Sequence, residues 1–388
     1  MEIYLDHNAT SPPSDEHLVH LQKVLKGSYG NPSSLHAKGR KAQSLIYSTQ
    51  KALAQSLGFL PQEVIFLSGG TEANNTVILG LKPQYPISSA IEHPCILKPL
   101  ESLKRPINYI NPTLLGIVTC EDLKSAITPE TDFITLMIAN NETGAIQEAK
   151  LFGDFLHKAR WEDPSLVPQG LTQDHLRSLH FHVDAIQAYG KIPFTEWTSL
   201  GYDSVSLSIH KIGGVQGIGA LLLRKKTSGN QILNPLLYGG PQQRNRRPGT
   251  ENLLGIASFS LIHEELQKDS WWQQISQLRE YRDHLWSFLE PHVHMFSPQK
   301  ECLPNTLYFA CKGGEDLILE MDMSQIYATA GSACSSGVQL ESHVLKAMGI
   351  PKEISKHAIR LSLGLDFEEH QLKRLEKFLW GKLQKIIF

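Results

Sequence analysis

The feature that most constrains the fold of this chain is an alternation of short β-rich runs with longer stretches of helical period. This alternation predicts a mostly parallel sheet with helices on both faces, which makes the chain an α/β protein. The expected strands cover residues 63–67, 133–138, 181–183 and 204–208, and the expected helices cover residues 42–55, the stretch after Thr71 and residues 151–160.

The pattern changes after Asn252. A long helical region is expected from about residue 255 to residue 290, followed by a second α/β segment and a final amphipathic helix. In that last helix acidic residues come early and Lys382 and Lys385 come late, which is the order that suits the helix dipole. We therefore expect a large domain up to about residue 255 and a smaller C-terminal one.

Composition argues against several classes of function. Lys and Arg number 37 against 39 Asp and Glu, so no basic surplus is available to neutralise nucleic-acid phosphates. No apolar run approaches the roughly 18 residues of a membrane span, and the first residues lack the regions of a secretory signal. The five cysteines have no CxxC spacing, which predicts neither a disulfide framework nor a cysteine zinc site and favours a cytoplasmic location.

Polar residues gather where the predicted strands end, at the edge where open parallel sheets bind ligands. The first strand ends in Ser68-Gly69-Gly70-Thr71-Glu72 before a helix. Such a turn suits an anion, typically phosphate, although glycines at strand–helix junctions also occur for steric reasons alone. The second strand ends in Asn140-Asn141-Glu142-Thr143-Gly144, which is either a turn that holds a ligand or an Asx-rich β-turn.

A row of polar residues follows in the next strand. His180, His182 and Asp184 alternate and therefore lie on one strand face. The row could ligate a metal. The alternative is that the histidines are half-buried and that only Asp184, with Gln187 three residues later, is functional.

Two further residues suggest covalent chemistry. Lys211 follows the strand at 204–208, and a lysine at a strand end in an enclosed site can form a Schiff base, although a surface lysine at a turn fits the pattern too. Cys334 stands among small residues in Ala330-Gly331-Ser332-Ala333-Cys334-Ser335-Ser336-Gly337, as expected of a nucleophile on an exposed loop. The other four cysteines resemble ordinary core or surface residues.

Together these segments resemble the cysteine desulfurases, pyridoxal-phosphate enzymes of the class-V aminotransferase family. The matching motifs run in family order from residue 4 to residue 364, and the length of the cysteine loop is similar to that of the NifS/IscS-type group. They are Tyr4-Leu5-Asp6 with Ala9-Thr10, Gly30-Asn31-Pro32-Ser33, residues 68–75, Glu92-His93-Pro94, residues 140–144, Val183-Asp184-Ala185 with Gln187, His210-Lys211, Gly249-Thr250-Glu251-Asn252, Gly331-Ser332-Ala333-Cys334 and Ile359-Arg360-Leu361-Ser362.

The resemblance implies the pyridoxal-phosphate transferase fold of type I. Its large cofactor-binding domain would cover residues 15–255, and residues 1–14 with 256–388 would form the small α/β domain that carries the cysteine loop. Homodimerisation is implied as well, because the phosphate site is shared between subunits in this family.

By the same resemblance, Lys211 would carry pyridoxal 5'-phosphate as a Schiff base and His93 would stack on its ring. Asp184 would pair with the pyridinium nitrogen, which keeps the ring an electron sink. Gln187 and Asn141 would bond the ring hydroxyl. The residues expected at the phosphate are Gly70, Thr71, Ser208 and His210, with Thr250 of the partner subunit.

The resemblance also implies how the substrate is handled. Arg360 would clamp the carboxylate of L-cysteine through a bidentate fork. Cys334 would attack the substrate sulfur, leave an enzyme persulfide and release L-alanine. The catalytic residues implied are therefore Lys211, Cys334 and His93, and no metal ligand is among them.

Some positions depart from the family pattern. Ile209 stands where Gly or Ala is usual, and its branched side chain is expected to crowd the cofactor phosphate. Val215-Gln216 and Pro248 also differ. Residues 161–179, with Pro164, Pro168 and Gly170, are expected to be an inserted, irregular surface loop, serving either as a partner or lid surface or as a tolerated insertion. The long C-terminal tail of some IscS-type proteins is not expected.

The sequence thus predicts a cysteine desulfurase that supplies sulfur for iron–sulfur clusters, thiolated tRNA or thio-cofactors. Its expected partner is a sulfur acceptor or iron–sulfur scaffold protein. One alternative is a selenocysteine lyase or another class-V enzyme, against which the long cysteine loop argues. The others are a sulfur-carrier or assembly protein that has lost its own chemistry, and the metal site of His180, His182 and Asp184.

Overall fold

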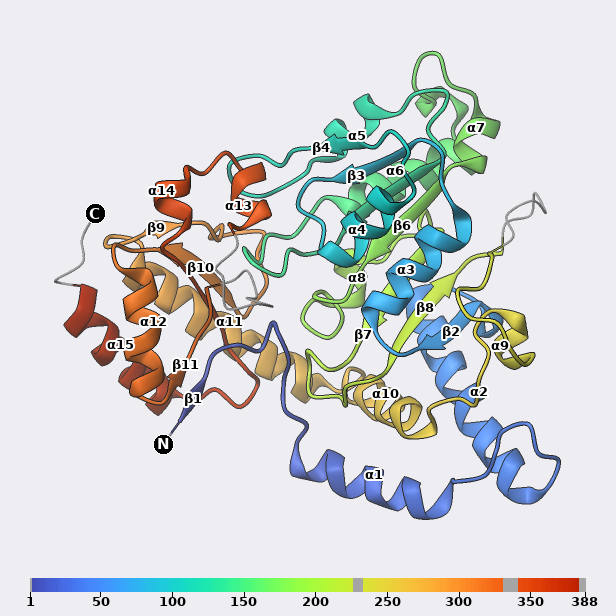
Figure 1. The fold of residues 1–388 in the computed structure, drawn as a ribbon, viewed down its shortest axis with the longest axis horizontal. Coiled ribbons are helices and arrows are strands. Elements are labelled where there is room, and N and C mark those ends of the chain that lie inside the picture. Colours follow the sequence, from blue (N-terminus) through green and yellow to red (C-terminus); the bar gives the residue numbers. More distant parts are fainter. Residues whose placement is uncertain (1, 226–232, 331–340, 384–388) are drawn as a thin grey trace.

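A seven-stranded sheet forms the centre of the molecule, in the order β2-β8-β7-β6-β5-β3-β4 (Figure 1). The computed structural model describes residues 2–225, 233–330 and 341–383. Strand β8 runs antiparallel to its neighbours β2 and β7, and the other pairs are parallel, which confirms the predicted α/β class. The strands are β2 (Val64–Leu67), β3 (Pro86–Ser89), β4 (Asn108–Ile110), β5 (Phe133–Met137), β6 (His180–Asp184), β7 (Ser204–Ser208) and β8 (Gly219–Leu223).

Ten helices and two short 3-10 turns belong to the described chain up to residue 265. They are α1 (Asp15–Gly27), α2 (Ala37–Leu57), η1 (Pro61–Glu63), α3 (Gly70–Leu81), α4 (Pro94–Ser102), α5 (Cys120–Ala126), α6 (Ala149–Trp161), η2 (Pro164–Leu166), α7 (Gln173–Ser178), α8 (Phe194–Trp197), α9 (Gln242–Asn245) and α10 (Leu253–Glu265). In the part of the chain that the structure describes, no helix combines the length and the apolar character needed to cross a lipid bilayer.

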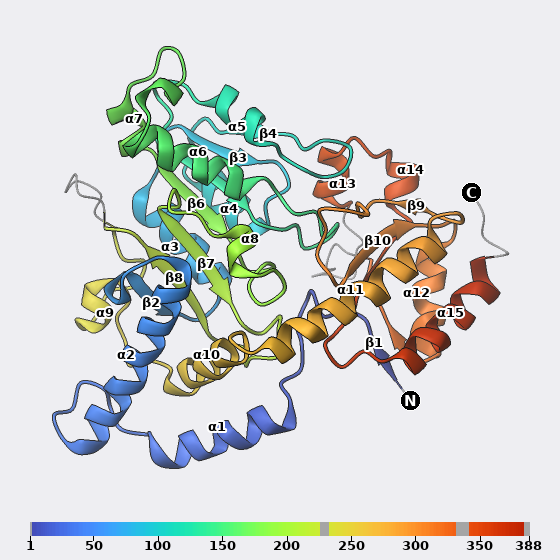
Figure 2. The ribbon, with the colours of Figure 1, turned by 180° about the vertical axis from the view of Figure 1, so that it is seen from behind.

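Two hydrophobic clusters cover the two faces of this sheet. Ile65 and Leu67 of β2 belong to one cluster with apolar residues of α3 and α4. Val64 and Phe66 belong to the other cluster, with residues of α2, α6 and α10, because successive side chains of a strand point to opposite faces. Figures 1 and 2 show these two groups of helices on opposite sides of the sheet. Burial of both faces explains why its strands are apolar runs.

A smaller antiparallel sheet, in the order β12-β10-β9, lies beside the large one. Leu307 and Phe309 of β10 pack into a cluster with α11, α12 and α15, whereas Tyr308 and Ala310 face Ile91, near the end of β3. The elements of this part are α11 (Asp269–Leu289), β9 (His294–Met295), β10 (Thr306–Ala310), α12 (Gly314–Met323), β11 (Ile326–Tyr327), α13 (His343–Ala347), α14 (Lys352–Ser355), β12 (Ala358–Ser362) and α15 (Glu369–Leu383).

The N-terminal segment joins the two parts. Strand β1 (Ile3–Tyr4) pairs in parallel with β11, and Asp6 forms a bridge with Ser362 of β12. The chain then passes the edge of the large sheet and continues into α1 (Figure 2). The division into residues 15–255 against 1–14 with 256–388 stays a prediction.

The structure corrects two expectations about helices. The helical region predicted over 255–290 consists of two helices, α10 and α11, with a break at residues 266–268. The indole of Trp272 donates to the carbonyl of Leu266 at 3.0 Å, which satisfies a carbonyl at the end of α10. The loop predicted over 161–179 is more ordered than expected, since it contains η2 and α7 and buries Leu176 and Leu179.

Arg160 is the physical reason for that order. Its buried guanidinium donates to the carbonyls of Leu176 (2.7 Å), Leu179 (2.7 Å) and Gly201 (3.0 Å), and it pairs with Asp203 at 3.0 Å. One side chain thus ties the 161–179 segment to α6 and to the turn before β7. A charge buried at this depth needs all of these partners.

We predict that Arg160→Met lowers the free energy of unfolding by about 3–5 kcal/mol, because it leaves Asp203 buried without its cation. Urea denaturation followed by circular dichroism would measure the loss. Lys158→Met, at an exposed position of the same helix, is the control and should change stability by less than about 0.5 kcal/mol. Equal stability of the two variants would contradict this account.

Candidate functional site

A pocket opens where β2, β5, β6 and β7 end, at the carboxyl edge of the large sheet. Predicted site residues line it together: Gly70, Thr71, His93, Asn141, Asp184, Gln187, Ser208, His210 and Lys211. Among the described residues, Thr250 and Arg360 are not part of this lining, and Cys334 lies outside the described residues. The chemical roles assigned to these residues stay predictions.

One end of the pocket is built for an anion. Helix α3 begins at Gly70, and the residue before it, Gly69, has no side chain that could cap the helix. The first backbone N–H groups of α3 therefore have no side-chain acceptor at that position. A Cβ at Gly70 would lie 2.0 Å from Cδ1 of Ile186, so a larger residue would fit only if the Ile186 side chain moved. The buried hydroxyl of Ser208 has no hydrogen-bond partner among the described residues. A phosphate group fits these donors.

Asp184 supplies a buried carboxylate to the same pocket. Its Oδ1 accepts from the backbone N–H of Ile186 at 2.9 Å, and its Oδ2 accepts from Asn74 Nδ2 at 2.7 Å. Burial raises the pKa of Asp184 above its ordinary value, and these hydrogen bonds together with the nearby Lys211 offset only part of that rise. A protonated ring nitrogen is a fitting partner for such a carboxylate.

The histidine row does not have the geometry of a metal site. His182 uses both ring nitrogens, one with Asn74 Oδ1 at 3.0 Å and the other with Ser204 Oγ at 2.8 Å. His180 bonds the same hydroxyl at 2.7 Å. Both rings are fully buried, not half-buried as expected, and burial lowers the pKa of His182 to about 3. Within the described ranges, no three metal-ligating side chains come together.

Lys211 points into the pocket from the turn after β7. Its Nζ donates to the main-chain carbonyl of Asn8 at 2.9 Å. Burial, followed by the nearby charge of Arg360, lowers the pKa of Lys211 to about 8, although Asp184 opposes the shift. The amine is therefore far more nucleophilic near neutral pH than an exposed lysine. Burial and Lys211 also lower the pKa of His210 to about 4.

Ile209 does not crowd this site, contrary to expectation. Its side chain is fully buried in the hydrophobic cluster that contains α2, α6 and α10, and it is not part of the described lining of the pocket. Gly214 makes room for it, because a Cβ at Gly214 would lie 2.5 Å from Cδ1 of Ile209.

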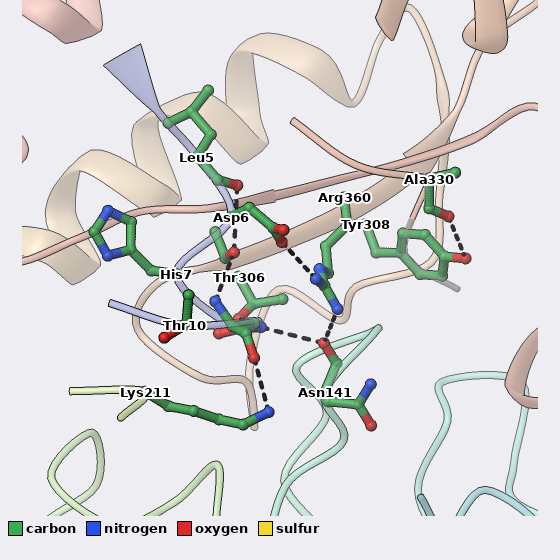
Figure 3. Close-up of polar contacts among 12 residues, drawn as sticks. Leu5, Asp6, His7, Thr10, Asn141, Lys211, Thr306, Tyr308, Ala330 and Arg360 are labelled. Carbon is green, nitrogen blue, oxygen red and sulfur yellow. Dashed lines mark hydrogen bonds and ion pairs between the residues drawn. The ribbon is translucent and has the colours of Figure 1, made fainter. Parts of the chain in front are cut away.

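Arg360 reaches the site from β12 of the small sheet. Its Nη2 pairs with Asp6 Oδ1 at 2.6 Å, and its Nη1 donates to the main-chain carbonyl of Asn141 at 2.9 Å. Figure 3 shows Arg360, Asn141 and Lys211 converging from three separate segments. The guanidinium thus lies beside the pocket, and the Asp6 carboxylate and the Asn141 carbonyl are among the groups that hold it.

Cys95 is a pocket residue that sequence reasoning took for an ordinary core or surface cysteine. Its Sγ lies 2.9 Å from His93 Nδ1 and accepts from Asn74 Nδ2 at 3.1 Å. Its backbone N–H also donates to His93 Nδ1 at 3.1 Å. Burial raises the pKa of Cys95 to about 12, so the thiol keeps its hydrogen and donates it to Nδ1.

This contact assigns the proton of His93. Because Nδ1 accepts two hydrogen bonds, the neutral ring carries its hydrogen on Nε2. Burial and the charge of Lys211 lower the pKa of His93 to about 4, which keeps the ring neutral near pH 7. Cys95 stands two residues after His93, and that spacing at the start of α4 is the sequence signal that could have identified it.

We predict that iodoacetamide modifies the native protein first at Cys334 near neutral pH. Cys95, Cys120, Cys302 and Cys311 are buried, and burial raises the pKa of each thiol, which keeps the reactive thiolate scarce. Peptide mass spectrometry would compare native protein with protein unfolded in urea, in which all five cysteines should react. Labelling of Cys95 as fast as Cys334 in the native protein would contradict this prediction.

Known proteins similar to this chain point to one family. The family model described as aminotransferase class-V matches residues 3–161 and 167–375, with its interruption inside the expected insertion. The cysteine desulfurase IscS of Dictyoglomus turgidum is 36% identical over 94% of this chain and 90% of its own length. A solved NifS-like protein superposes with a TM-score of 0.84 at 28% identity, covering 99% of this chain and all of that one.

A second solved structure, SspA in complex with cysteine, has a TM-score of 0.75 and 26% identity over 94% of this chain and 99% of that chain. The family model covers most of the chain, and the Dictyoglomus relative is similar along nearly its whole length. This chain therefore belongs to the class-V aminotransferase family, in its NifS/IscS-like group of cysteine desulfurases.

Proposed function

We propose that this protein is a pyridoxal-phosphate-dependent cysteine desulfurase that converts L-cysteine to L-alanine and transfers the sulfur to Cys334. The observation that carries the proposal is the meeting of three groups in one pocket. These are the buried amine of Lys211, the buried carboxylate of Asp184 and the open N-terminus of α3. The names of its relatives and the cysteine complex of SspA support the choice of substrate.

The pocket residues fit pyridoxal 5'-phosphate group by group. Gly70, Thr71, Ser208 and His210 would hold the phosphate, and Asp184 would pair with the ring nitrogen. Gln187 and Asn141 would bond the ring oxygen, His93 would stack on the ring, and Lys211 would attach the aldehyde carbon. When bound, the cofactor supplies an electron sink for charge that develops at the substrate.

The protein's own groups orient the substrate and move protons. Arg360 would bind the carboxylate of L-cysteine, and the contact with Asp6 holds the guanidinium in place. With a pKa of about 8, Lys211 can both accept and donate a proton near neutral pH. His93, neutral with its hydrogen on Nε2, offers a further hydrogen-bond donor to the pocket that it lines.

Cys334 would complete the reaction. Its thiolate attacks the sulfur of the substrate, so an S–S bond forms as the carbon–sulfur bond breaks, and protons return to the carbon skeleton. L-Cysteine and one enzyme thiol thus become L-alanine and one enzyme persulfide. The role of Cys334 rests on the resemblance of its motif, because it lies outside the described residues.

A second copy of the chain would complete the cofactor site. Thr250, expected to reach the phosphate, is exposed here and is not in the described lining of the pocket, as fits a residue that serves a partner subunit. Apolar side chains are exposed on and after α1, including Leu18, Leu25 and Leu35. A homodimer would cover such residues. The sulfur acceptor or scaffold protein and the cytoplasmic location stay predictions.

The first test is release of alanine from L-cysteine by purified protein supplied with pyridoxal phosphate and excess thiol reductant. Wild-type protein should release alanine, and Cys334→Ala and Lys211→Ala should each lose at least about a hundredfold of this activity, because each removes a reacting group. Chromatography of derivatised amino acids would measure it.

The Lys211→Ala variant also tests the sulfur-carrier alternative. Unchanged sulfur delivery by this variant would contradict the proposed mechanism. A wild-type protein that binds the cofactor but releases no alanine would contradict the choice of L-cysteine, and selenocysteine would then be tested as substrate.

A second prediction concerns pH. The unprotonated amine of Lys211 is the form that attaches the cofactor, and its pKa is lowered to about 8. The rate of cofactor attachment should therefore rise with pH and reach a plateau above about pH 8. About two pH units below this pKa, the rate should be about a hundredfold lower than on the plateau. Stopped-flow absorbance on cofactor-free protein would measure it, with Lys211→Ala as the control. A rate that still rises above pH 10 would contradict the lowered pKa.

A further inference from the structure

Lys191 is a buried lysine behind the pocket for which the proposed mechanism has no use. Only 4% of its surface is exposed, and it lies four residues after Gln187 in the turn that follows β6. Its Nζ donates to Gln187 Oε1 at 2.8 Å and to Asn8 Oδ1 at 2.7 Å. A lysine buried this deeply is costly, and an apolar side chain would avoid that cost.

The first contact fixes which way the Gln187 amide points. The Lys191 amine donates to one end of the amide, and the main-chain carbonyl of Asn8, which can only accept, lies at the other end, so the end that faces Lys191 is the oxygen. The NH₂ group of Gln187 is then the end that donates to the main-chain carbonyl of Asn8 at 2.9 Å. An amide nitrogen has two hydrogens and Asn8 takes one, so the other is available to a ligand in the pocket that Gln187 lines.

The second contact makes this arrangement rigid. Asn8 Oδ1 also accepts from Asn305 at 3.2 Å, and Asn8 Nδ2 donates to Thr306 Oγ1 at 2.8 Å. The same Asn8 carbonyl that accepts from Gln187 accepts from Lys211. Asn8 therefore cannot turn its side chain without breaking bonds to both sheets, and Lys191 is held against a fixed acceptor.

The charged groups around Lys191 do not remove its donor role. Lys211 and Arg360 face it, and His7 and His210 lie near enough to feel its charge. Burial, together with the charges of Lys211 and Arg360, lowers the pKa of Lys191 well below its ordinary value. A neutral amine still has two N–H groups, which is enough for the two acceptors.

We propose that Lys191 is a positioning residue that holds the Gln187 amide with its NH₂ group toward the ring oxygen of bound pyridoxal phosphate. The inference rests on the proposed function, because that oxygen belongs to the cofactor. Without Lys191 only the Asn8 carbonyl still opposes a turn of the amide, and a turned amide would bring its oxygen toward the ring oxygen, so that two acceptors face each other.

The test compares two cofactors on cofactor-free protein: pyridoxal 5'-phosphate and its 3-deoxy analogue, which lacks the ring oxygen. Wild-type protein should bind the first about tenfold more tightly, the size expected of a hydrogen bond to a charged acceptor. Lys191→Met should lose the part of this preference that Gln187 supplies, keep the part that Asn141 supplies, and bind the analogue nearly as well as wild type does. Fluorescence titration would measure both affinities.

Control variants distinguish a positioning role of Lys191 from a general loss of structure. Lys373→Met, at an exposed site on α15, should keep the wild-type preference. Gln187→Leu should lose at least as much of the preference as Lys191→Met does, and Lys191→Met added to it should cause no further loss if Lys191 acts through that amide. Lys191→Leu repeats the test with a different apolar shape.

The outcomes are distinct. An unchanged preference in Lys191→Met, or an equal loss of affinity for both cofactors, would overturn the positioning role. Failure of both the Met and the Leu variants to fold would make Lys191 a structural residue and overturn it too. Failure of wild-type protein to bind either cofactor would instead overturn the proposed function.

Discussion

The buried hydrogen bonds of Asn8 are the interaction on which the arrangement of the site depends. Its side chain contacts Lys191 in the turn after β6 of the large sheet and Thr306 on the small sheet, and its carbonyl accepts from Lys211. Asn8 is only 1% exposed, and hydrogen bonds buried to this degree are costly to break. The position of Lys211 in the pocket therefore depends on where residues 5–11 lie. The pairing of β1 with β11 holds the start of that segment in place.

Buried charge is the second constraint. Lys191, Lys211 and Arg360 lie near one another, and the opposing carboxylates are Asp6 and Asp184. Burying a cation costs free energy unless anions or hydrogen-bond acceptors pair with it. The pocket is thus suited to ligands with negative charge, such as a phosphate and a carboxylate. The nearby charge of Arg360 also contributes to the lowered pKa of Lys211.

A chain of hydrogen bonds links the core to the other side of the site. It runs from His182 through Asn74, which donates both to Asp184 and to Cys95, and it ends at His93. Every donor and acceptor in this chain of hydrogen bonds has one consistent assignment. The same chain therefore orients both Asp184, which is expected at the ring nitrogen, and His93, which is expected on the ring. Sequence motifs contain Asn74 without showing this role.

Much of the fold and of the pocket was predictable from local pattern. Apolar runs with polar residues at their ends mark the strands and one edge of a parallel sheet, and this pattern predicts Asp184 and Lys211 at that edge. Ser208 was expected there only from the family resemblance, and the pocket contains all three residues. The break between α10 and α11, the ordering of 161–179 by Arg160, the pocket position of Cys95 and the contact of Asn8 with Lys191 were decided only in the tertiary structure. Most of these depend on contacts between residues far apart in the chain, such as Asn8 with Thr306, which no local periodicity records.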